Sequence, residues 1–271
     1  MRLDIAELLT AEVREPDWVV EGIVPRGTIV LVAGDAGVGK SVMNLAEGLH
    51  VALGRPFLGY PTRRSRVLYF DEENSFPDVS AYLQQLWVGM GKPDPADLIP
   101  WFRLEHFSLG RRDWPTVADG VCDTFKPEMI YVDTATSALA VEDEDDNAEA
   151  QRHLQALRRI MDRYGRPAIK VLKHAKFQTG GGHIGQTRRT IRGAKAWLGA
   201  VDQVLYHIRR PGRPRKDGLK ETLLVPDKSR AHGLKNNIRI MPEYVQGDGP
   251  KGLILQGESF ESETDLMVVG D

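Results

Sequence analysis

A glycine-rich stretch, GDAGVGKS at residues 34–41, constrains the fold of this chain more than any other feature. It matches the pattern GxxxxGK[ST], the Walker A loop, at every fixed position. An uninterrupted apolar run, TIVLVA at 28–33, precedes it, and a segment with apolar residues at helical spacing, MNLAEGLHVAL, follows it. A buried strand, a glycine loop and a helix in this order predict a loop that holds phosphate groups at a helix N-terminus.

In such a loop the glycines let backbone N–H groups turn inward toward phosphate oxygens. The predicted ligands are ATP and Mg²⁺, with Lys40 reaching the β- and γ-phosphates and the Ser41 hydroxyl on the metal ion. The alternative is a glycine turn without a ligand, which does not explain why a strand and a helix flank the match. The predicted nucleotide-binding residues are Gly34, Asp35, Ala36, Gly37, Val38, Gly39, Lys40, Ser41 and Val42.

Apolar runs alternate with helical patterns along the rest of the chain. The runs are RVLYFD (66–71), WFRLEHF (101–107), EMIYVDT (128–134) and AIKVLKH (168–174). Near the end, QVLYHI, ETLLVP, NNIRIM and GLILQ indicate antiparallel strands joined by turns. We therefore expect an α/β fold with a mostly parallel central sheet, helices on both faces and antiparallel C-terminal strands.

Composition limits the domain organisation and the partners. The 271 residues, 41% of them hydrophobic, are sufficient for one large α/β domain or at most two small ones. We expect a lead-in or interface segment at 1–27, the core domain at 28–256 and a flexible tail at 257–271. No apolar run approaches the roughly 20 residues that span a bilayer, so we predict a cytoplasmic protein without a membrane partner. The single cysteine, Cys122, excludes an intramolecular disulfide and is expected to pack in the core.

Acidic residues close two of the predicted strands. Asp133 ends the run EMIYVDT, at the place where parallel sheets carry active-site groups, and suits the Walker B role of holding the Mg²⁺ shell. Glu72 and Glu73 follow RVLYFD, where a carboxylate can activate the water that attacks the γ-phosphate. The competing interpretations are a polar strand cap for Asp133 and a solvated acidic turn for the glutamates. The residues alone do not decide between Glu72 and Glu73.

Over residues 16–232 the sequence resembles the RecA-like ATPases related to the RepA-type hexameric replicative helicase of plasmids and phages. The resemblance depends on the order of several segments, of which only the glycine loop is specific by itself. Two departures are Lys173-His174, where the family often has two histidines, and Ala194-Lys195, which replace small hydroxyl residues. The segments are PDWVVEGIVPRGTIVLVAGDAGVGKS, LGRPFLGYPTRRSRVLYFDEEN, IYVDTATSALAVEDEDDN, KVLKHAK, IRGAKAWLGAVDQVLYH and VPDKSR.

The resemblance implies specific roles for several residues. It places the catalytic glutamate at Glu73 and a γ-phosphate-sensing histidine at His174. Lys228 and Arg230 match a K-x-R finger that enters the nucleotide site of the neighbouring subunit. A finger that acts on a neighbour requires a head-to-tail assembly, and the family forms a homo-oligomeric ring, usually a hexamer. Without the resemblance, each residue has a simpler interpretation. His174 could equally be a polar residue at the sheet edge, and Arg230 could be a surface cation.

Two basic segments are candidates for contact with DNA. QTGGGHIGQTRRT at 178–190 combines glycines with Arg188 and Arg189, close to Lys176. In the RecA-like arrangement this loop lines a central channel and touches single-stranded DNA, although a basic loop without DNA is an equal alternative. RRPGRPRKDG at 209–218 is the densest basic cluster, which we interpret as a solvated hairpin rather than a minor-groove hook.

The sequence thus favours a Mg²⁺-dependent, oligomeric ATPase (an ATP hydrolase) acting on DNA, in the manner of a helicase or translocase in DNA replication. A regulatory or scaffold ATPase of the same fold, which assembles with nucleotide and moves no strand, stays open because the net charge is only −2. A phosphotransferase is the third alternative, and no arginine-rich lid segment favours it.

Overall fold

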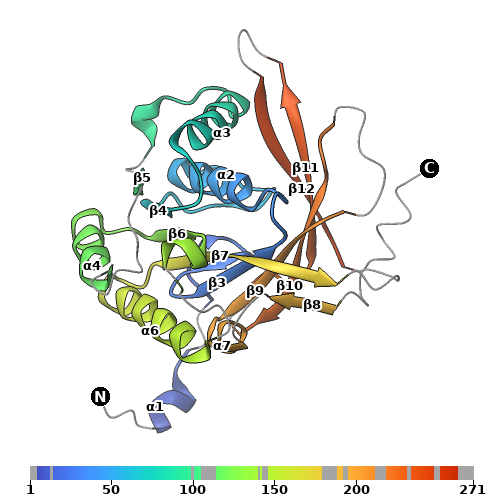
Figure 1. Cartoon of the computed structure of the whole chain (residues 1–271). Helices are drawn as coiled ribbons and strands as arrows, with labels where there is room; N and C mark the ends of the chain where they lie inside the picture. Colours follow the sequence, from blue (N-terminus) through green and yellow to red (C-terminus); the bar gives the residue numbers. More distant parts are fainter. Residues whose placement is uncertain are drawn as a thin grey trace.

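The computed structural model of the chain describes residues 5–12, 15–98, 101–104, 114–139, 141, 146–178, 188–191, 195–210, 218–230, 233–246 and 251–261. Within these residues a 10-stranded sheet forms the centre, with strand order β12-β11-β10-β9-β3-β7-β6-β4-β5 and β8 paired to β7 (Figure 1). The strands are β3 (Ile29–Gly34), β4 (Val67–Asp71), β5 (Trp101–Leu104), β6 (Met129–Asp133), β7 (Ala168–Gln178), β8 (Arg188–Ile191), β9 (Gln203–Arg209), β10 (Thr222–Ser229), β11 (Asn237–Val245) and β12 (Gly252–Phe260).

The sheet has a parallel part and an antiparallel part. Strands β9, β3, β7, β6, β4 and β5 pair in parallel, while β10, β11 and β12 pair antiparallel beyond β9. The predicted fold class, a mostly parallel central sheet with helices and antiparallel C-terminal strands, is confirmed.

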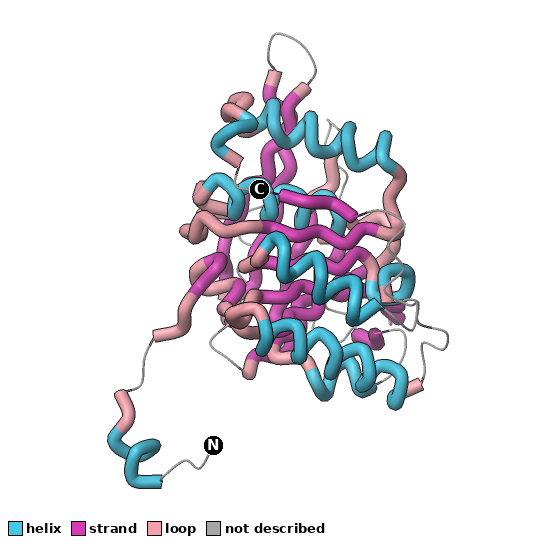
Figure 2. Tube along the Cα trace, turned by 90° about the vertical axis from the view of Figure 1, so that its left-hand side faces the viewer, coloured by secondary structure: helices cyan, strands magenta, loops and turns pink. Residues whose placement is uncertain are grey.

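Helices cover both faces of the sheet (Figures 1 and 2). One face carries α2 (Lys40–Leu53), α3 (Phe76–Gly89) and the short 3₁₀ helix η1 (Pro95–Asp97). The opposite face carries α4 (Trp114–Phe125), α5 (Ala135–Ala138), α6 (Asn147–Arg163) and α7 (Lys195–Ala200). Among the described residues, no helix is long and apolar enough to cross a membrane.

Burial on both faces explains the uninterrupted apolar runs. In β3, Ile29 and Leu31 pack into the core beneath α4, α6 and α7, whereas Val30 and Val32 pack into the core beneath α2 and α3. A strand covered on both sides needs apolar residues at every position, so it shows no alternation. Cys122 lies fully buried in the first of these cores, which confirms its expected packing role.

Side-chain caps set where two helices begin. The Ser75 side chain accepts a hydrogen bond from the Asp78 N–H and starts α3. The Asp146 side chain accepts one from the Ala148 N–H, so α6 begins at Asn147.

The N-terminal segment divides into two parts. Helix α1 (Ile5–Thr10) stands away from the rest of the chain in both views, with Ile5 and Leu9 exposed (Figures 1 and 2). Strands β1 (Trp18–Val20) and β2 (Val24–Pro25) pair with each other, and their valines lie in the core under α2. This part of the predicted lead-in therefore packs as part of the core domain.

The C-terminal strands differ from expectation in three ways. Strand β9 pairs in parallel with β3 on one side and antiparallel with β10 on the other, whereas only antiparallel pairing was expected. Strand β12 continues to Phe260, beyond the predicted boundary at 256. Residues 188–190, expected in a loop, belong to β8 (Arg188–Ile191), which pairs with an extension of β7.

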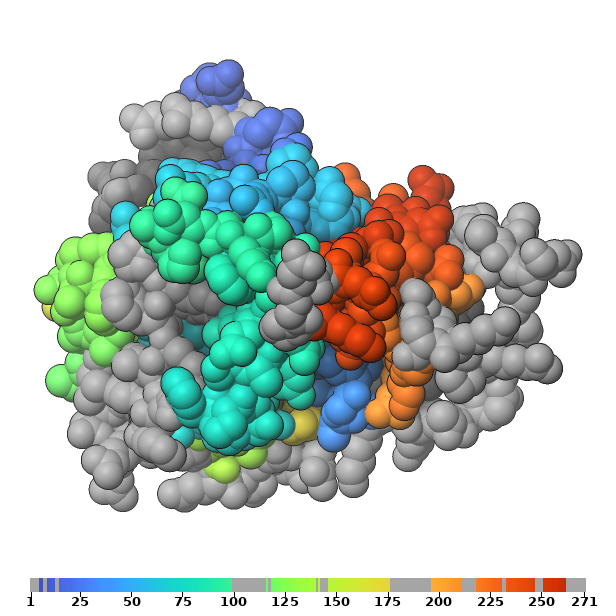
Figure 3. All heavy atoms as spheres, turned by 90° about the horizontal axis from the view of Figure 1, so that it is seen from above, coloured from blue at the N-terminus to red at the C-terminus, as the bar shows by residue number. Residues whose placement is uncertain are grey.

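Strand β12 also lies against α3, as the red and teal segments show from above (Figure 3). A Cβ atom on Gly89 of α3 would lie 2.1 Å from the Leu253 carbonyl oxygen. Only glycine allows this close approach, which joins the C-terminal strands to the helix layer of α2 and α3.

Candidate nucleotide-binding and hydrolysis site

The glycine loop lies at the carboxyl edge of the parallel strands, between β7 and β9. Gly34 ends β3 and pairs with His174 of β7. On its other side, a Cβ atom on Gly34 would lie 2.3 Å from the His207 carbonyl oxygen of β9, so only glycine fits. The loop is therefore held in a fixed position by the two strands that flank β3.

The loop leads directly into the N-terminus of α2. Gly37 and Gly39 have φ values of +68° and +99°, in the region that glycine adopts without strain. Gly39 is the N-cap residue and supplies no side-chain hydrogen bond. The first N–H groups of a helix have no partner within it, so those of α2 are available to an anion, and the helix dipole favours negative charge there.

Lys40 points back into the loop. Its Nζ donates hydrogen bonds to the carbonyl oxygens of Gly34 and Asp35, each at 2.9 Å. Burial lowers the pKa of Lys40, and the nearby carboxylates of Glu73 and Asp133 oppose that shift. The ammonium group thus lies between the loop and the acidic residues at the ends of β4 and β6.

Asp133 ends β6 with its side chain completely buried. Its Oδ2 accepts hydrogen bonds from the Tyr69 hydroxyl at 2.9 Å and from Asn74 Nδ2 at 3.4 Å. Burial raises the pKa of Asp133 to about 6, while the Ser41 and Tyr69 hydroxyls favour the charged form. Its Oδ1 accepts no hydrogen bond of normal geometry from the described residues.

This donor set fits a hard divalent cation. A buried carboxylate oxygen that accepts no hydrogen bond of normal geometry, together with the nearby Ser41 hydroxyl, offers the oxygen ligands that Mg²⁺ takes. Among the described residues, no group of three or more His, Cys, Asp or Glu could hold a metal ion by itself. This is the expected arrangement for Mg²⁺ that is bound through one or two protein oxygens together with substrate phosphates.

A turn after β4 positions Glu73. Asp71 pairs with Asp133 across the sheet, and its Oδ1 accepts hydrogen bonds from the N–H groups of Glu73 and Asn74 at 3.2 and 3.0 Å. The turn leaves the Glu73 side chain 38% exposed, with its Oε1 at 3.4 Å from His174 Nε2. Glu72, by contrast, has a buried carboxyl oxygen. Of the two candidate glutamates, Glu73 is the one that faces Lys40 and His174.

The structure thus brings together the residues predicted for the carboxyl edge, which are Gly34–Val42 of the loop and α2, Glu73, Asp133 and His174. It places the predicted finger elsewhere. Lys228 Nζ donates to the Leu198, Gly199 and Val201 carbonyls, and Arg230 Nη2 donates to Gly199 O at 2.7 Å. Both cations hold the C-terminus of α7.

Strand pairing locates this second region at the opposite edge of the sheet. The Arg230 N–H bonds to Asp202 O, and Asp202 in turn binds the N–H of Ile29 at the start of β3. The start and the end of β3 are separated by roughly 16 Å, at about 3.3 Å per residue. Lys228 and Arg230 therefore do not reach the glycine loop of their own chain.

The candidate DNA contacts lie mostly outside the described residues. Residues 179–187 of the basic loop are not described. Lys176, Arg188 and Arg189 have described backbones in the β7–β8 pair, while their side chains lie outside the described part. Their predicted role stays a prediction.

Sequence reasoning missed a buried polar network beneath α2. Lys170 Nζ donates to Glu47 Oε2 at 2.6 Å and the Tyr131 hydroxyl donates to Glu47 Oε1 at 2.9 Å, with all three side chains inaccessible. Tyr131 stacks on Tyr69, which holds Asp133. The signal was available, because Lys170 and Glu47 interrupt otherwise apolar segments and a buried charge needs a partner.

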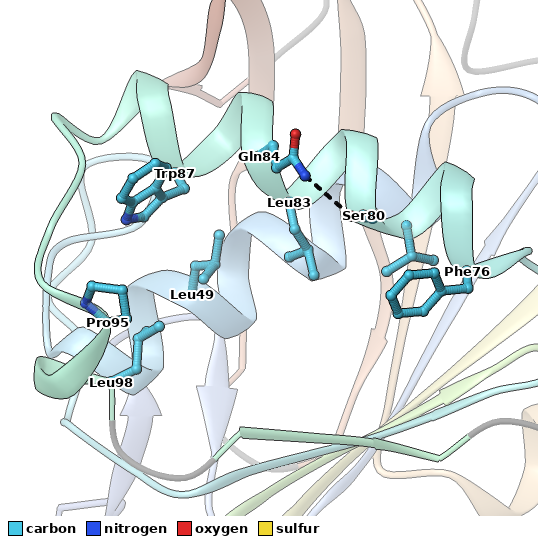
Figure 4. A pocket seen from close by; sticks show the side chains of 9 residues that line it. Leu49, Phe76, Ser80, Leu83, Gln84, Trp87, Pro95 and Leu98 are labelled. Atoms are coloured by element: carbon cyan, nitrogen blue, oxygen red, sulfur yellow. Dashed lines mark hydrogen bonds between the residues drawn. The ribbon is translucent and has the colours of Figure 1, made fainter. Parts of the chain in front are cut away.

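An apolar pocket of about 470 Å³ lies elsewhere, between α2, α3 and the segment around η1 (Figure 4). None of the predicted site residues lines it. Its wall is formed by Leu49, Phe76, Val79, Ser80, Leu83, Gln84, Trp87, Pro95 and Leu98.

Comparisons with known proteins agree with this geometry. The chain is similar to the RadB recombinase (19% identity, TM-score 0.54, 80% of this chain and 88% of that one). It is also similar to a KaiC-like protein of Pyrococcus horikoshii OT3 (16% identity, TM-score 0.53, 88% and 94%). These similarities confirm the RecA-like fold. None of the curated proteins matches the sequence. A family model described as "AAA domain" matches residues 1–179, more than half of the sequence, and the chain belongs to that family.

Proposed function

We propose that this protein hydrolyses ATP in a Mg²⁺-dependent reaction at the carboxyl edge of its sheet. The observation that carries the proposal is the convergence of Lys40, Asp133, Glu73 and His174, from four different elements, on one glycine loop. Structural carboxylates and cations normally pair with each other directly. Here a buried carboxylate oxygen of Asp133 accepts no hydrogen bond of normal geometry from the described residues, and the half-exposed Glu73 lies beside the same phosphate-binding loop.

Each residue has a distinct task in this reaction. The loop N–H groups and Lys40 bind the phosphate oxygens and stabilise the charge that develops on them. Ser41 and Asp133 would hold Mg²⁺, which neutralises phosphate charge when bound. Glu73 accepts a proton from the water that attacks the γ-phosphorus, and ADP leaves from the opposite side. His174, 3.4 Å from Glu73, contacts both the carboxylate and the end of β3, so it can respond to the presence of the terminal phosphate.

We further propose that the protein works as a homo-oligomer in which Lys228 and Arg230 act on the nucleotide of a neighbouring subunit. Their position at the opposite edge supports an action in trans, since they do not reach their own loop. A contact between two different surfaces of identical subunits generates a ring or a filament. The resemblance to hexameric helicases supports a ring, and one structural neighbour is a recombinase, which supports action on DNA.

The test is ATP hydrolysis by the purified chain with increasing single-stranded DNA. A DNA-acting motor predicts Mg²⁺-dependent turnover that rises with DNA and saturates. The net charge of −2 favours the second candidate, a regulatory ATPase whose assembly depends on nucleotide. That candidate predicts turnover and assembly independent of DNA. The absence of turnover in both conditions, in protein shown to be assembled, contradicts the proposal.

A further inference from the structure

A strand without a predicted role borders the phosphate loop. Strand β9 lies beside β3 on the side away from β7, and its pairing with β3 reaches Ala33 and Tyr206. Beyond that pair, the His207 carbonyl meets Gly34 closely, as described above. Strand β9 therefore continues past the end of β3 and runs along the loop.

The side chains of alternate β9 residues face the loop. Leu205 packs into the core on the α2 side, so His207 and Arg209 project to the same side. His207 Cε1 lies 3.9 Å from the position that a Cβ atom would take on Gly39. Arg209 Nη2 lies 3.7 Å from the corresponding position on Gly37. The Arg209 guanidinium is thus next to a glycine of the phosphate loop in the same chain.

Arg209 and its neighbour Arg210 differ in their partners. Arg210 donates to Glu221 Oε2 at 2.5 Å, and Glu221 also accepts a hydrogen bond from Arg239 at 3.0 Å. The Arg209 side chain is exposed and forms no ion pair or hydrogen bond within the described part of the chain. Its backbone is nevertheless held in the sheet opposite Thr222. One arginine is neutralised by a carboxylate, and the other keeps its charge available beside the loop.

We propose that Arg209 is a nucleotide-binding residue that donates hydrogen bonds to the phosphate oxygens of the nucleotide bound in its own chain, an inference that rests on the proposed function. A guanidinium group carries a permanent charge and a planar set of donors that matches phosphate geometry. Gly37 and Gly39 leave room between this group and the loop. Arg209 therefore supplies a cation in cis on the flank opposite His174, whereas Arg230 is proposed to act in trans.

The experiment measures equilibrium binding of a fluorescent, slowly hydrolysed ATP analogue and its displacement by inorganic tripolyphosphate, both with Mg²⁺. The variants are Arg209→Ala, Arg209→Lys, the matched control Arg210→Ala and Lys40→Ala. We expect Arg209→Ala to weaken the analogue and tripolyphosphate alike by about 10-fold, the effect of a lost charged hydrogen bond. Arg209→Lys should lie between Arg209→Ala and wild type, and Arg210→Ala should stay within about twofold of wild type. Arg209 is exposed, so the variant should keep the wild-type melting temperature.

The outcomes separate this inference from the proposed function. If Lys40→Ala weakens binding and Arg209→Ala does not, the role of Arg209 is overturned while the ATP site stands. Weaker binding of the analogue with unchanged tripolyphosphate competition would mean contact with base or ribose, and would overturn the phosphate assignment. An effect of Arg209→Ala on single-stranded DNA binding alone would also overturn it. Failure of the wild-type chain to bind the analogue would remove both proposals.

Discussion

The two edges of the central sheet use the same kinds of charged residue differently. At the carboxyl edge, Lys40, Asp133 and Glu73 lie near one another, and a carboxylate oxygen of Asp133 accepts no normal hydrogen bond from the described residues. At the amino edge, Lys228 and Arg230 are held by the backbone carbonyls of α7. One edge keeps polar groups desolvated and available, whereas the other uses charges to fix the end of a helix.

This difference in hydrogen bonding distinguishes charged residues that await a ligand from charged residues that stabilise the fold. Polar groups that are buried without full hydrogen bonding cost free energy, so a fold retains them where a ligand completes them. Cations that already bind carbonyl oxygens stabilise the helix C-terminus. In the single chain, Lys228 and Arg230 are structural, and only assembly with a neighbour would give them a second role.

The largest expected effect is on turnover when Arg230 is replaced. Arg230→Ala should lower the kcat of the assembled protein by about 1,000-fold, as for other arginine fingers, and leave nucleotide affinity unchanged. Lys235→Ala, which removes an exposed cation from the same region, is the control. A mixture of Arg230→Ala and Glu73→Gln chains should recover activity, because some sites then combine an intact Glu73 with a neighbour's Arg230. No recovery in mixed assemblies would count against action in trans.

A somewhat smaller loss of turnover is expected at the carboxyl edge from Glu73→Gln. Removing the proton acceptor should lower kcat by about 100-fold or more, with little change in the affinity for nucleotide. Glu72→Gln is the matched control. Glu72 is the neighbouring glutamate, and its carboxyl group has a buried oxygen, unlike the exposed Glu73. Steady-state hydrolysis and analogue binding measure both effects. Equal losses in the two variants would show that the turn after β4, rather than Glu73, is responsible.

Replacing Asp133 should measure how much the buried carboxylate at the carboxyl edge destabilises the folded protein. Its pKa is raised from 3.8 to about 6 by burial, so the folded state favours the protonated form, and stability is lost as pH rises through this interval. Asp133→Asn removes this cost and should raise the free energy of unfolding at pH 7.5 by up to about 3 kcal/mol, without metal or nucleotide. The gain should vanish near pH 4.

Thermal unfolding across this pH range measures the effect of Asp133→Asn. Asp123→Asn, a change at an exposed carboxylate that pairs with Lys126, should leave the unfolding temperature at pH 7.5 nearly unchanged and serves as the control. A less stable Asp133→Asn protein at pH 7.5 would mean that the carboxylate is fully satisfied in the folded chain.

The smallest effect is expected from Lys228→Met at the amino edge. Losing its hydrogen bonds to the carbonyls of α7 should cost about 1–2 kcal/mol of stability. Nucleotide affinity of the single chain should not change, because Lys228 does not reach the glycine loop. Weaker analogue binding by monomeric Lys228→Met protein would contradict the assignment of Lys228 to a structural role in the single chain.

Local patterns in the sequence predicted the elements that carry the loop. The strand before Gly34, the helix from Lys40, the strand that ends at Asp133 and the acidic turn with Glu73 after β4 each follow from neighbouring residues. The parallel pairing of β9 with β3 did not, because it joins segments far apart in the chain. The position of Arg209 beside Gly37 depends on that pairing, so local sequence patterns could not predict it either.

Short-range hydrogen bonds were also missed. Asp71 builds the turn that directs Glu73, because its side chain accepts hydrogen bonds from the backbone N–H groups two and three residues later, a local pattern that Asp often forms at the start of a turn. The binding of Lys228 to α7 was missed for a different reason, since a K-x-R pattern does not say which backbone carbonyls lie beside it.

All of these proposals require that the loop between Gly34 and Ser41, with Lys40, binds Mg-ATP at the carboxyl edge. The most direct test of this requirement is equilibrium binding of a slowly hydrolysed ATP analogue with Mg²⁺ to the wild-type chain and to Lys40→Ala. We expect saturable binding by the wild-type chain that Lys40→Ala weakens by at least about 10-fold, since a charged hydrogen bond to phosphate is lost. Equal binding by both proteins, or none by the wild-type chain, would contradict it.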